Sequence, residues 1–302
     1  MHGYRIGVDL GGTKIEAAAL DNAGAITLRR RAATPAGNYD ATLASIAELV
    51  ASLEAQLRSR ASVGIATPGA QSLVDGRIKN ANSTCLNGRP LKEDLERRLK
   101  REVRIANDAN CFALSEAVDG AARGAGSVFG VILGTGVGGG IVIDGRIVTG
   151  ANAIAGEWGH NPLPSPDASD SPLPPCYCGR RGCIETYLSG PGLSADLARA
   201  CGQKLEAIEI ATRAEAGDRA CVAAMERYER RLARSLAGVI NVLDPEVIVL
   251  GGGLSNIRRL YAGLPRLCKE FVFSDDIRTR VVAPMHGDSS GVRGAAWLWN
   301  SN

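Results

Sequence analysis

Hydrophobic residues recur along this 302-residue chain with two different spacings, and stretches of the two kinds alternate. Short apolar runs bounded by glycine or polar residues are typical of strands, whereas apolar residues three and four apart are typical of helices. The predicted strands are Arg5–Asp9, Ile15–Leu20, Val103–Ala106, Ser127–Leu133, Ile141–Ile143, Arg146–Val148 and Glu246–Leu250. The predicted helices are Asp40–Arg58, a segment marked by Leu91, Leu95 and Leu99, a segment from Tyr228 to Leu243 ended by Pro245, and Gly291–Trp299. Strands that alternate with helices predict an α/β protein.

Glycine-rich turns follow three of these strands. Gly11 to Lys14 follows the first strand, and a second copy of the pattern, Gly134 to Gly140, follows a later one. Such turns let backbone N–H groups approach an anion, and Thr13 and Lys14 add a hydroxyl and a positive charge. One turn alone is as typical of a plain hairpin as of a nucleotide loop. Two copies indicate a duplicated α/β unit that binds a polyphosphate, and Gly251 to Gly253 is a third turn of this kind.

The composition changes this picture little, because 45% hydrophobic and 22% charged residues are typical of an ordinary globular protein. A domain commonly has about 150 residues, so the length suggests two domains. No apolar stretch has the length of a membrane span. The first strand begins at Arg5, so we expect neither a signal peptide nor a preceding DNA-binding module. These features predict a cytoplasmic protein with no membrane partner.

The charge distribution argues against nucleic acid as a partner, since the formal net charge is only +3. The basic clusters Arg97–Arg104 and Arg227–Arg234 are interleaved with Glu, which favours solvated helix faces over phosphate-binding patches. Ser165–Pro175 is rich in proline and small polar residues, and this composition predicts an irregular loop.

A carboxylate and an amide stand directly after the strand Val103–Ala106, at Asn107 and Asp108. Ligands of open α/β sheets bind at the carboxyl ends of strands, so Asp108 is placed to act as a general base for a substrate hydroxyl. The pair is also typical of helix N-caps, and the other motifs of the chain decide between the two interpretations. Asp9 ends the first strand and is placed to hold a metal ion or its water.

Three of the eight cysteines are clustered as C-x-C-x-x-x-x-C, at Cys176, Cys178 and Cys183, and His160 lies a short way upstream. Three thiolates and one imidazole complete a closed tetrahedral zinc shell, and a closed shell is structural because no position stays open for substrate water. The alternative is a set of reduced surface thiols in a glycine loop. Ligand number, type and spacing favour structural zinc.

The chain resembles the ROK family (repressors, open reading frames, kinases), a family of sugar kinases, in six motifs that run in order over essentially its whole length. These motifs are Asp9–Lys14, Ala106–Asn110, Gly134–Gly136, Glu157–His160, Cys176–Glu185 and Leu250–Gly253. The resemblance implies the actin-like ATPase (ribonuclease H-like) fold, with two duplicated α/β lobes around a cleft. It also implies a homodimer that phosphorylates a hexose with ATP and Mg²⁺. The expected small lobe comprises residues 1–118 and 289–302, and the large lobe with the zinc-binding loop comprises 119–288.

Roles for single residues also follow from the resemblance. Asp108 is expected to be the base. The residues expected on sugar hydroxyls, besides Asp108, are Gly69, Asn82, Asn107, Glu157, His160 and Glu185. The residues expected to face the nucleotide phosphates, ribose or metal are Asp9, Gly11, Gly12, Thr13, Lys14, Thr135, Gly136, Gly251 and Gly252.

The substrate is expected to be a free hexose phosphorylated on its 6-hydroxyl. The segment Lys79–Gly88 and the two motifs around the cysteines resemble the fructokinase or mannofructokinase branch, so fructose is predicted and mannose is the next choice. A glucokinase or an N-acetylmannosamine kinase of the same family is the alternative. From other classes, a non-catalytic sugar-sensing regulator would need an amino-terminal helix-turn-helix domain, and a chaperone-type ATPase would not need the cysteines. Many relatives have a shorter segment between His160 and Cys176, so the resemblance assigns no role to Ser165–Pro175.

Overall fold

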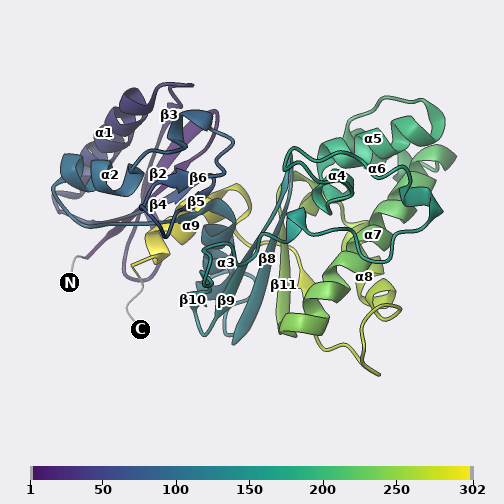
Figure 1. Cartoon of the computed structure of the whole chain (residues 1–302). Helices are drawn as coiled ribbons and strands as arrows, with labels where there is room; N and C mark the ends of the chain where they lie inside the picture. The colour runs from purple at the N-terminus through teal and green to yellow at the C-terminus, as the bar shows by residue number, and fades with distance from the viewer. Residues whose placement is uncertain (1–2, 300–302) are drawn as a thin grey trace. The chain divides into compact units, whose positions relative to one another are not determined.

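The computed structural model describes residues 3–299, which form two compact units (Figure 1). Unit 1 comprises the described parts of Met1–Gly124, Gly140–Ala155 and His286–Asn302, and unit 2 comprises Ala125–Gly139 and Gly156–Met285. Among these described residues, no helix combines the length and apolar character that a bilayer crossing needs. The lobe boundaries predicted from the sequence stay a prediction, and their ends, residues 1–2 and 300–302, lie outside the described residues.

Unit 1 is built on a five-stranded sheet of order β3-β2-β1-β4-β7. Its strands are β1 (Arg5–Leu10), β2 (Lys14–Leu20), β3 (Ile26–Ala33), β4 (Ser62–Thr67) and β7 (Val103–Asn107). The first three are antiparallel neighbours, whereas β1, β4 and β7 run parallel. Because parallel strands end at the same edge, Asp9 and Asn107 are presented on one side of the sheet. A separate two-stranded ribbon joins β5 (Ala70–Gln71) to β6 (Ile78–Lys79).

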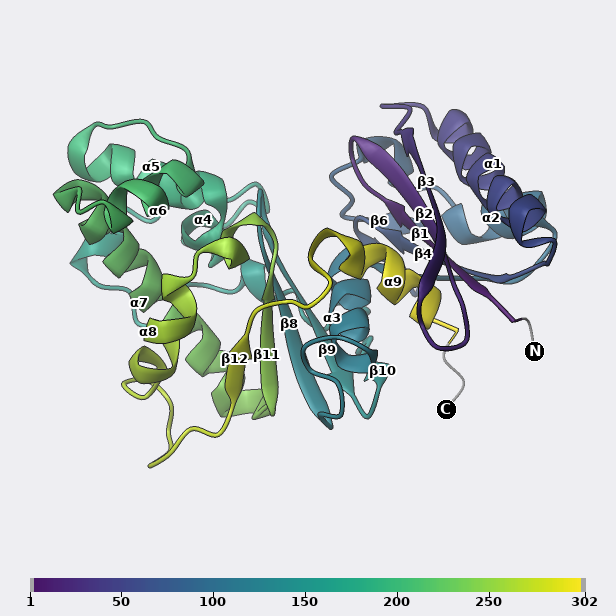
Figure 2. The same cartoon turned by 180° about the vertical axis from the view of Figure 1, so that it is seen from behind.

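Helices cover both faces of this sheet (Figure 2). On one face, α1 (Tyr39–Leu57) and α2 (Leu91–Leu99) bury their leucine stripes against β1, β2 and β4 in one large apolar core. On the other face lie α3 (Asp108–Val118) and α9 (Ser290–Trp297). The helix α9 comes very close to the strands, because a Cβ atom at Gly7 or Gly64 would lie 1.8 Å from a carbonyl oxygen of α9.

Unit 2 contains most of a second sheet, of order β10-β9-β8-β11-β12, and the boundary between the units falls inside β9. The strands of this sheet are β8 (Ser127–Leu133), β9 (Val137–Ile143), β10 (Arg146–Ile147), β11 (Val247–Gly251) and β12 (Arg280–Val282), of which β10 belongs to unit 1. The helices of unit 2 are α4 (Glu185–Leu188), α5 (Gly190–Cys201), α6 (Ala207–Glu215), α7 (Arg219–Leu243) and α8 (Arg259–Cys268). The long helix α7 packs against the other four, which places it at the centre of this layer.

The turn after β8 is shorter than the predicted turn Gly134 to Gly140. Only residues 134–136 form the turn, because β9 already begins at Val137 and contains Gly138, Gly139 and Gly140. These glycines serve close packing: a Cβ atom at Gly139 would lie 2.8 Å from the carbonyl oxygen of Gly156, and one at Gly140 would lie 2.6 Å from that of Ala109. The prediction counted glycines as turn formers, although a strand also needs them where another chain segment crosses closely.

Two further expectations differ from the structure in unit 2, the first in part and the second in full. The stretch Ser165–Pro175 contains a 3₁₀ helix, Ala168–Asp170, with a capping box between Asp167 and Asp170, so it is only partly irregular. The basic cluster Arg227–Arg234 is no solvated face, because the side chains of Arg231 and Arg234 are only 2% and 4% exposed. Both differences have one cause, since the buried Asp170 of the first segment pairs with the arginines of the second.

Candidate active site

The junction between β7 and α3 separates the two interpretations of the Asn-Asp pair. Asn107 is the N-cap of α3, and its Oδ1 accepts hydrogen bonds from the backbone N–H of Ala109 at 2.8 Å and of Asn110 at 3.2 Å. Asp108 is the first residue of the helix and is exposed, and its Oδ1 accepts from the backbone N–H of Ala109 at 2.8 Å. The cap interpretation therefore applies to Asn107. The carboxylate of Asp108 stands at the positive end of the helix dipole, open to solvent.

The amide of Asn107 also binds the loop that follows β4. Its Nδ2 donates to the carbonyl oxygen of Gly69 at 3.3 Å. Gly69 has a positive φ of 76° and packs so closely on the next segment that a Cβ atom would lie 2.4 Å from the carbonyl oxygen of Lys79. Asn82, three residues further on, is exposed. Unit 1 therefore brings Gly69 and Asn107 into contact, and one N–H of the Asn107 amide remains for another partner.

Asp9 is a carboxylate whose ionisation is opposed by its surroundings in unit 1. Burial is the main cause that raises the pKa of its carboxyl group to about 6; the charges of Asp108 and Glu16 contribute to this rise, and Lys14 opposes it. Asp9 and Glu16 are cross-strand neighbours in β1 and β2. The turn between these strands is closed by the backbone N–H of Gly11, which donates to Lys14 O at 3.1 Å, and Gly12, Thr13 and Lys14 are exposed. Carboxylates that repel one another in this way suit a divalent cation.

Unit 2 places its glycine turns at neighbouring strand ends. The strands β8 and β11 are parallel neighbours, and the turn after each lies at the same edge. Gly252 has a φ of 78°, and a Cβ atom on it would lie 2.4 Å from the carbonyl oxygen of Leu133, just before the turn of Thr135 and Gly136. Thr135 is exposed. The structure therefore brings Gly251 and Gly252 next to the turn with which the sequence grouped them.

Glu185 lies against this turn as well. Its Oε2 accepts a hydrogen bond from the backbone N–H of Val137 at 3.0 Å, and a Cβ atom at Gly136 would lie 2.8 Å from the same oxygen. Glu185 is the first residue of α4, so the helix fixes where its carboxylate stands. A residue expected at the sugar and a turn expected at the nucleotide therefore share a contact in unit 2.

The four residues with zinc-ligand chemistry converge. One ligand atom each from His160, Cys176, Cys178 and Cys183 lies within 4.8 Å of the others. The Sγ atoms of Cys178 and Cys183 are 3.6 Å apart, and Cys176 Sγ lies 3.6 Å from Nδ1 of His160. Tetrahedral zinc with bonds of about 2.3 Å to sulfur requires sulfur atoms about 3.8 Å apart, so these residues fit the metal. A hydrogen bond from Arg180 lowers the pKa of the Cys178 thiol to about 6, whereas burial raises that of Cys183 to about 12.

Tyr177, which sequence reasoning missed, lies among the acidic and histidine residues of unit 2. Its hydroxyl is 2.9 Å from Nε2 of His160, on the side of the ring away from the cysteines. Partial desolvation raises the pKa of this hydroxyl to about 12, with further contributions from the charges of Glu185 and Glu157. Tyr177 is therefore in contact with His160 and lies within the electrostatic influence of Glu185 and Glu157. Its place between two ligand cysteines was the available signal.

Trp158, also missed, fixes the segment that carries Glu157 and His160. Its indole Nε1 donates to the carbonyl oxygen of Gly138 at 3.0 Å, and its ring meets Phe129 edge-on at 5.6 Å. Glu157 and His160 are three residues apart, but they do not share an α-helix. Instead, the exposed Glu157 precedes a short 3₁₀ helix, Trp158–His160.

Both α/β units carry glycine turns at their strand ends, and Asp108 is exposed at the start of α3, so the chain has two sets of turns suited to binding an anion. The chain belongs to the ROK family, whose model matches residues 5–302. It is 43% identical to an N-acetyl-D-glucosamine kinase from Pectobacterium atrosepticum, over 97% of both chains, and 42% identical to one from Photobacterium profundum, over 97% and 98%.

Solved structures agree with this membership. A ROK hexokinase from Thermus thermophilus superposes with a TM-score of 0.86 at 29% identity, covering 97% of both chains. A ROK family glucokinase from Streptomyces griseus, solved in complex with glucose and AMPPNP, has a TM-score of 0.78 at 29% identity and covers 98% of this chain and 99% of its own. The predicted family and fold are confirmed. The predicted preference for fructose finds no support among these relatives.

Proposed function

We propose that this kinase transfers the γ-phosphoryl group of ATP to N-acetyl-D-glucosamine. The observation that carries the substrate is the 43% identity, over 97% of both chains, to a protein named as an N-acetyl-D-glucosamine kinase. This proposal replaces the fructose expectation, which depended on the segment Lys79–Gly88 and on two short motifs around the cysteines. Specificity among hexoses depends on a few hydroxyl contacts that motif spacing does not resolve, so similarity over the whole chain is the better guide.

Asp108 is the general base in this proposal. Its carboxylate takes the proton of the sugar's primary hydroxyl while that oxygen attacks the γ-phosphorus, and the bond from this phosphorus to the β-phosphate oxygen breaks to release ADP. The exposed position at the start of α3 supports the role, because Asn107 already performs the capping. A positioned base typically contributes about 10² to 10⁴ in rate.

The phosphates of ATP are assigned to the turn residues and to Asp9. In unit 1 these are Gly11, Gly12, Thr13 and Lys14, and in unit 2 they are Thr135, Gly136, Gly251 and Gly252. Asp9 would hold Mg²⁺, directly or through water, because a cation there relieves the repulsion that raises the pKa of this carboxyl group to about 6. When bound, Mg²⁺ supplies positive charge to the phosphate oxygens of the nucleotide.

The sugar hydroxyls are assigned to polar side chains of both units. Asn107 offers its remaining amide N–H, with Gly69 and Asn82 on neighbouring loops, and unit 2 offers Glu157, His160 and Glu185. Zinc on Nδ1 of His160 would leave Nε2 as an N–H donor. The hydroxyl of Tyr177 contacts this nitrogen, and a sugar oxygen would take the place of that hydroxyl. The metal would be structural, because the four protein ligands complete its shell.

A coupled assay of ADP release tests the proposal over N-acetylglucosamine, N-acetylmannosamine, glucose, mannose and fructose. We expect the highest kcat/KM for N-acetylglucosamine. Fructose as the best substrate would restore the original expectation and overturn this one. ATP turnover that is independent of sugar would contradict a hexose kinase altogether.

The assignment of the base is tested in the same assay with Asp108→Asn. We expect kcat to fall by about 10² or more, with the KM for ATP unchanged, because the amide cannot accept the proton. Asp40→Asn is the matched control, since Asp40 is likewise exposed in the first turn of a helix of unit 1. Wild-type turnover by Asp108→Asn would remove Asp108 from the mechanism.

A further inference from the structure

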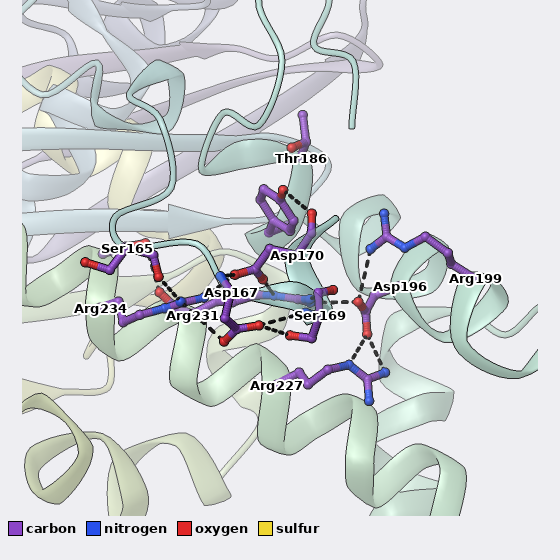
Figure 3. Close-up of polar contacts among 12 residues, drawn as sticks. Ser165, Asp167, Ser169, Asp170, Thr186, Asp196, Arg199, Arg227, Arg231 and Arg234 are labelled. Atoms are coloured by element: carbon purple, nitrogen blue, oxygen red, sulfur yellow. Dashed lines mark hydrogen bonds and ion pairs between the residues drawn. The ribbon is translucent and has the colours of Figure 1, made fainter. Parts of the chain in front are cut away.

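Helix α7 buries a row of arginines beneath the segment between His160 and the cysteines (Figure 3). Arg231 forms three contacts of different kinds. Its Nε donates to Oδ1 of Asp170 at 2.7 Å, one terminal nitrogen donates to Oδ1 of Asp196 at 2.8 Å, and the other donates to the carbonyl oxygen of Ser169 at 3.0 Å. The side chains of Arg231, Asp170 and Asp196 are 2%, 0% and 3% exposed.

Arginines outnumber the carboxylates in this cluster. Arg234 donates to Oδ2 of Asp170 at 2.8 Å, and Arg227 donates to Oδ2 of Asp196 at 2.6 Å. Two buried carboxylates therefore face two buried guanidinium groups, and two partly exposed arginines stand at the rim: Arg227, and Arg199, which donates to Oδ1 of Asp196 at 3.1 Å. Burial opposes the ionisation of Asp196, but Arg227 and Arg231 outweigh it and lower the pKa of this carboxyl group. Because breaking one partner of such a cluster leaves an uncompensated buried charge, the geometry is held firmly.

The segment 163–175, which we call the strap, connects this cluster to the zinc-ligand loop 176–183. At one end, the backbone N–H of Leu163 donates to Gly182 O at 2.9 Å. At the other end, the N–H of Gly182 donates to Pro174 O at 2.8 Å, and Pro175 forms a bridge with Arg181. Both ends of the strap are thus paired with the loop, while its middle is held by the arginines of α7.

Tyr187 joins the cluster to α4, the helix that begins with Glu185. Its hydroxyl donates to the carbonyl oxygen of Asp170 at 2.9 Å, and the guanidinium of Arg231 lies 5.1 Å from its ring centre. Tyr187 is 1% exposed and lies two residues after Glu185. In this four-residue helix, a shift of Tyr187 would carry the carboxylate of Glu185 with it.

We propose that the cluster of Asp170, Asp196 and Arg231 positions Glu185 for sugar binding, and that Tyr187 transmits this constraint. The strap is then a positioning element, which gives a role to the proline-rich stretch Ser165–Pro175. The inference rests on the proposed function, in which Glu185 contacts the sugar. Tyr187 itself touches no substrate, since its side chain is buried between the strap and α7.

Tyr187→Phe is the sharpest test, because it removes one hydroxyl and keeps the ring over Arg231. We expect the KM for the sugar to rise by about three- to tenfold, the effect of one lost hydrogen bond, while the KM for ATP and the zinc content stay unchanged. Tyr39→Phe is the matched control, since its buried hydroxyl donates to Oδ2 of Asp94 at 2.6 Å in unit 1. A general loss of stability would move both variants alike.

Glu185→Gln separates this inference from the proposed function. A sugar KM that Glu185→Gln leaves unchanged would refute the assignment of Glu185 to the sugar. If Glu185→Gln raises the sugar KM but Tyr187→Phe does not, the assignment stands and the positioning role is wrong. If both raise it, the double variant decides: a residue that acts through Glu185 adds nothing once Glu185 has been changed, whereas additive effects would overturn the inference.

Discussion

Asn107 and Asp108 divide two tasks that either could perform, and the backbone decides which residue takes which. Asn107 has extended dihedral angles, φ −62° and ψ 150°, which is the geometry that an N-cap requires, whereas Asp108 is already helical. The pair and its place at a strand end could be predicted from the sequence. The division of tasks could not, because it depends on where the first helical turn begins.

Asp9 illustrates how a residue suited to binding can weaken the fold. Its pKa is raised to about 6, so its stabilising contribution is fully present below the ordinary aspartate value and is lost as the pH rises through about 6. We therefore expect Asp9→Asn to have a free energy of unfolding about 1–3 kcal/mol higher than the wild type at pH 8 in the absence of divalent cations, measured by urea titration. The two proteins should agree at pH 4, where the wild-type carboxyl is protonated.

The neighbouring charge provides the control for this experiment. Asp108 is one of the two carboxylates that raise the pKa of Asp9. In an Asp108→Asn background, Asp9→Asn should therefore gain less at pH 8. A gain of equal size at pH 4 and pH 8 would show that ionisation of Asp9 is not its source.

At the scale of elements, α9 and α3 pack closely because α9 has a glycine, Gly294, at their contact. A Cβ atom at Gly294 would lie 1.7 Å from the carbonyl oxygen of Cys111, so Gly294→Ala forces the two helices apart. We expect this variant to lose about 1–3 kcal/mol of unfolding free energy, measured by urea titration.

Gly238→Ala is the matched control for Gly294→Ala. Gly238 lies in the interior of α7, and nothing stands within 4 Å of a Cβ atom placed on it. Alanine should stabilise the protein there by about 0.5–1 kcal/mol, through its higher helix propensity. Destabilisation of similar size at both positions would contradict the packing argument.

Periodicity predicted the elements whose burial is decided by their own residues. The helix expected at Asp40–Arg58 occupies Tyr39–Leu57, and the strand Ser127–Leu133 was predicted to the residue. Periodicity failed where a distant segment supplies the partner. Arg231 has the same residue type as a solvated arginine, and only Asp170 and Asp196 make its burial favourable. The glycines of β9 were misassigned for the same reason, since the segments that crowd them lie elsewhere in the chain.

At the scale of the whole molecule, we expect the stability of the fold to depend on zinc bound by His160 and the three cysteines. A metal that binds the folded loop and not the unfolded chain stabilises the protein by mass action. We expect freshly purified protein to contain about one zinc per chain, and a chelator to lower the Tm as zinc is released. Elemental analysis that finds less than about half an equivalent would contradict the four-ligand shell, and a Tm that is independent of zinc loss would contradict its structural role.

The candidate site was predictable in its residues more than in its substrate. The motifs named the groups that now cluster in each unit, including Glu185 beside Gly136 and the cysteines around His160. Tyr177 and Trp158 escaped because their roles depend on contacts rather than on spacing. The preferred hexose and the homodimer stay predictions. Turnover of each sugar tests the first, and light scattering tests the second.

The packing of α9 against Gly7 and Gly64 has a consequence for biosynthesis. Unit 1 contains both early residues and the stretch from His286 onward, whereas unit 2 ends at Met285. A ribosome therefore synthesises all of unit 2 before it makes α9, one of the two helices on that face of the first sheet. Until then the nascent chain leaves the backbone at these two glycines uncovered, so the half that is begun first is finished last.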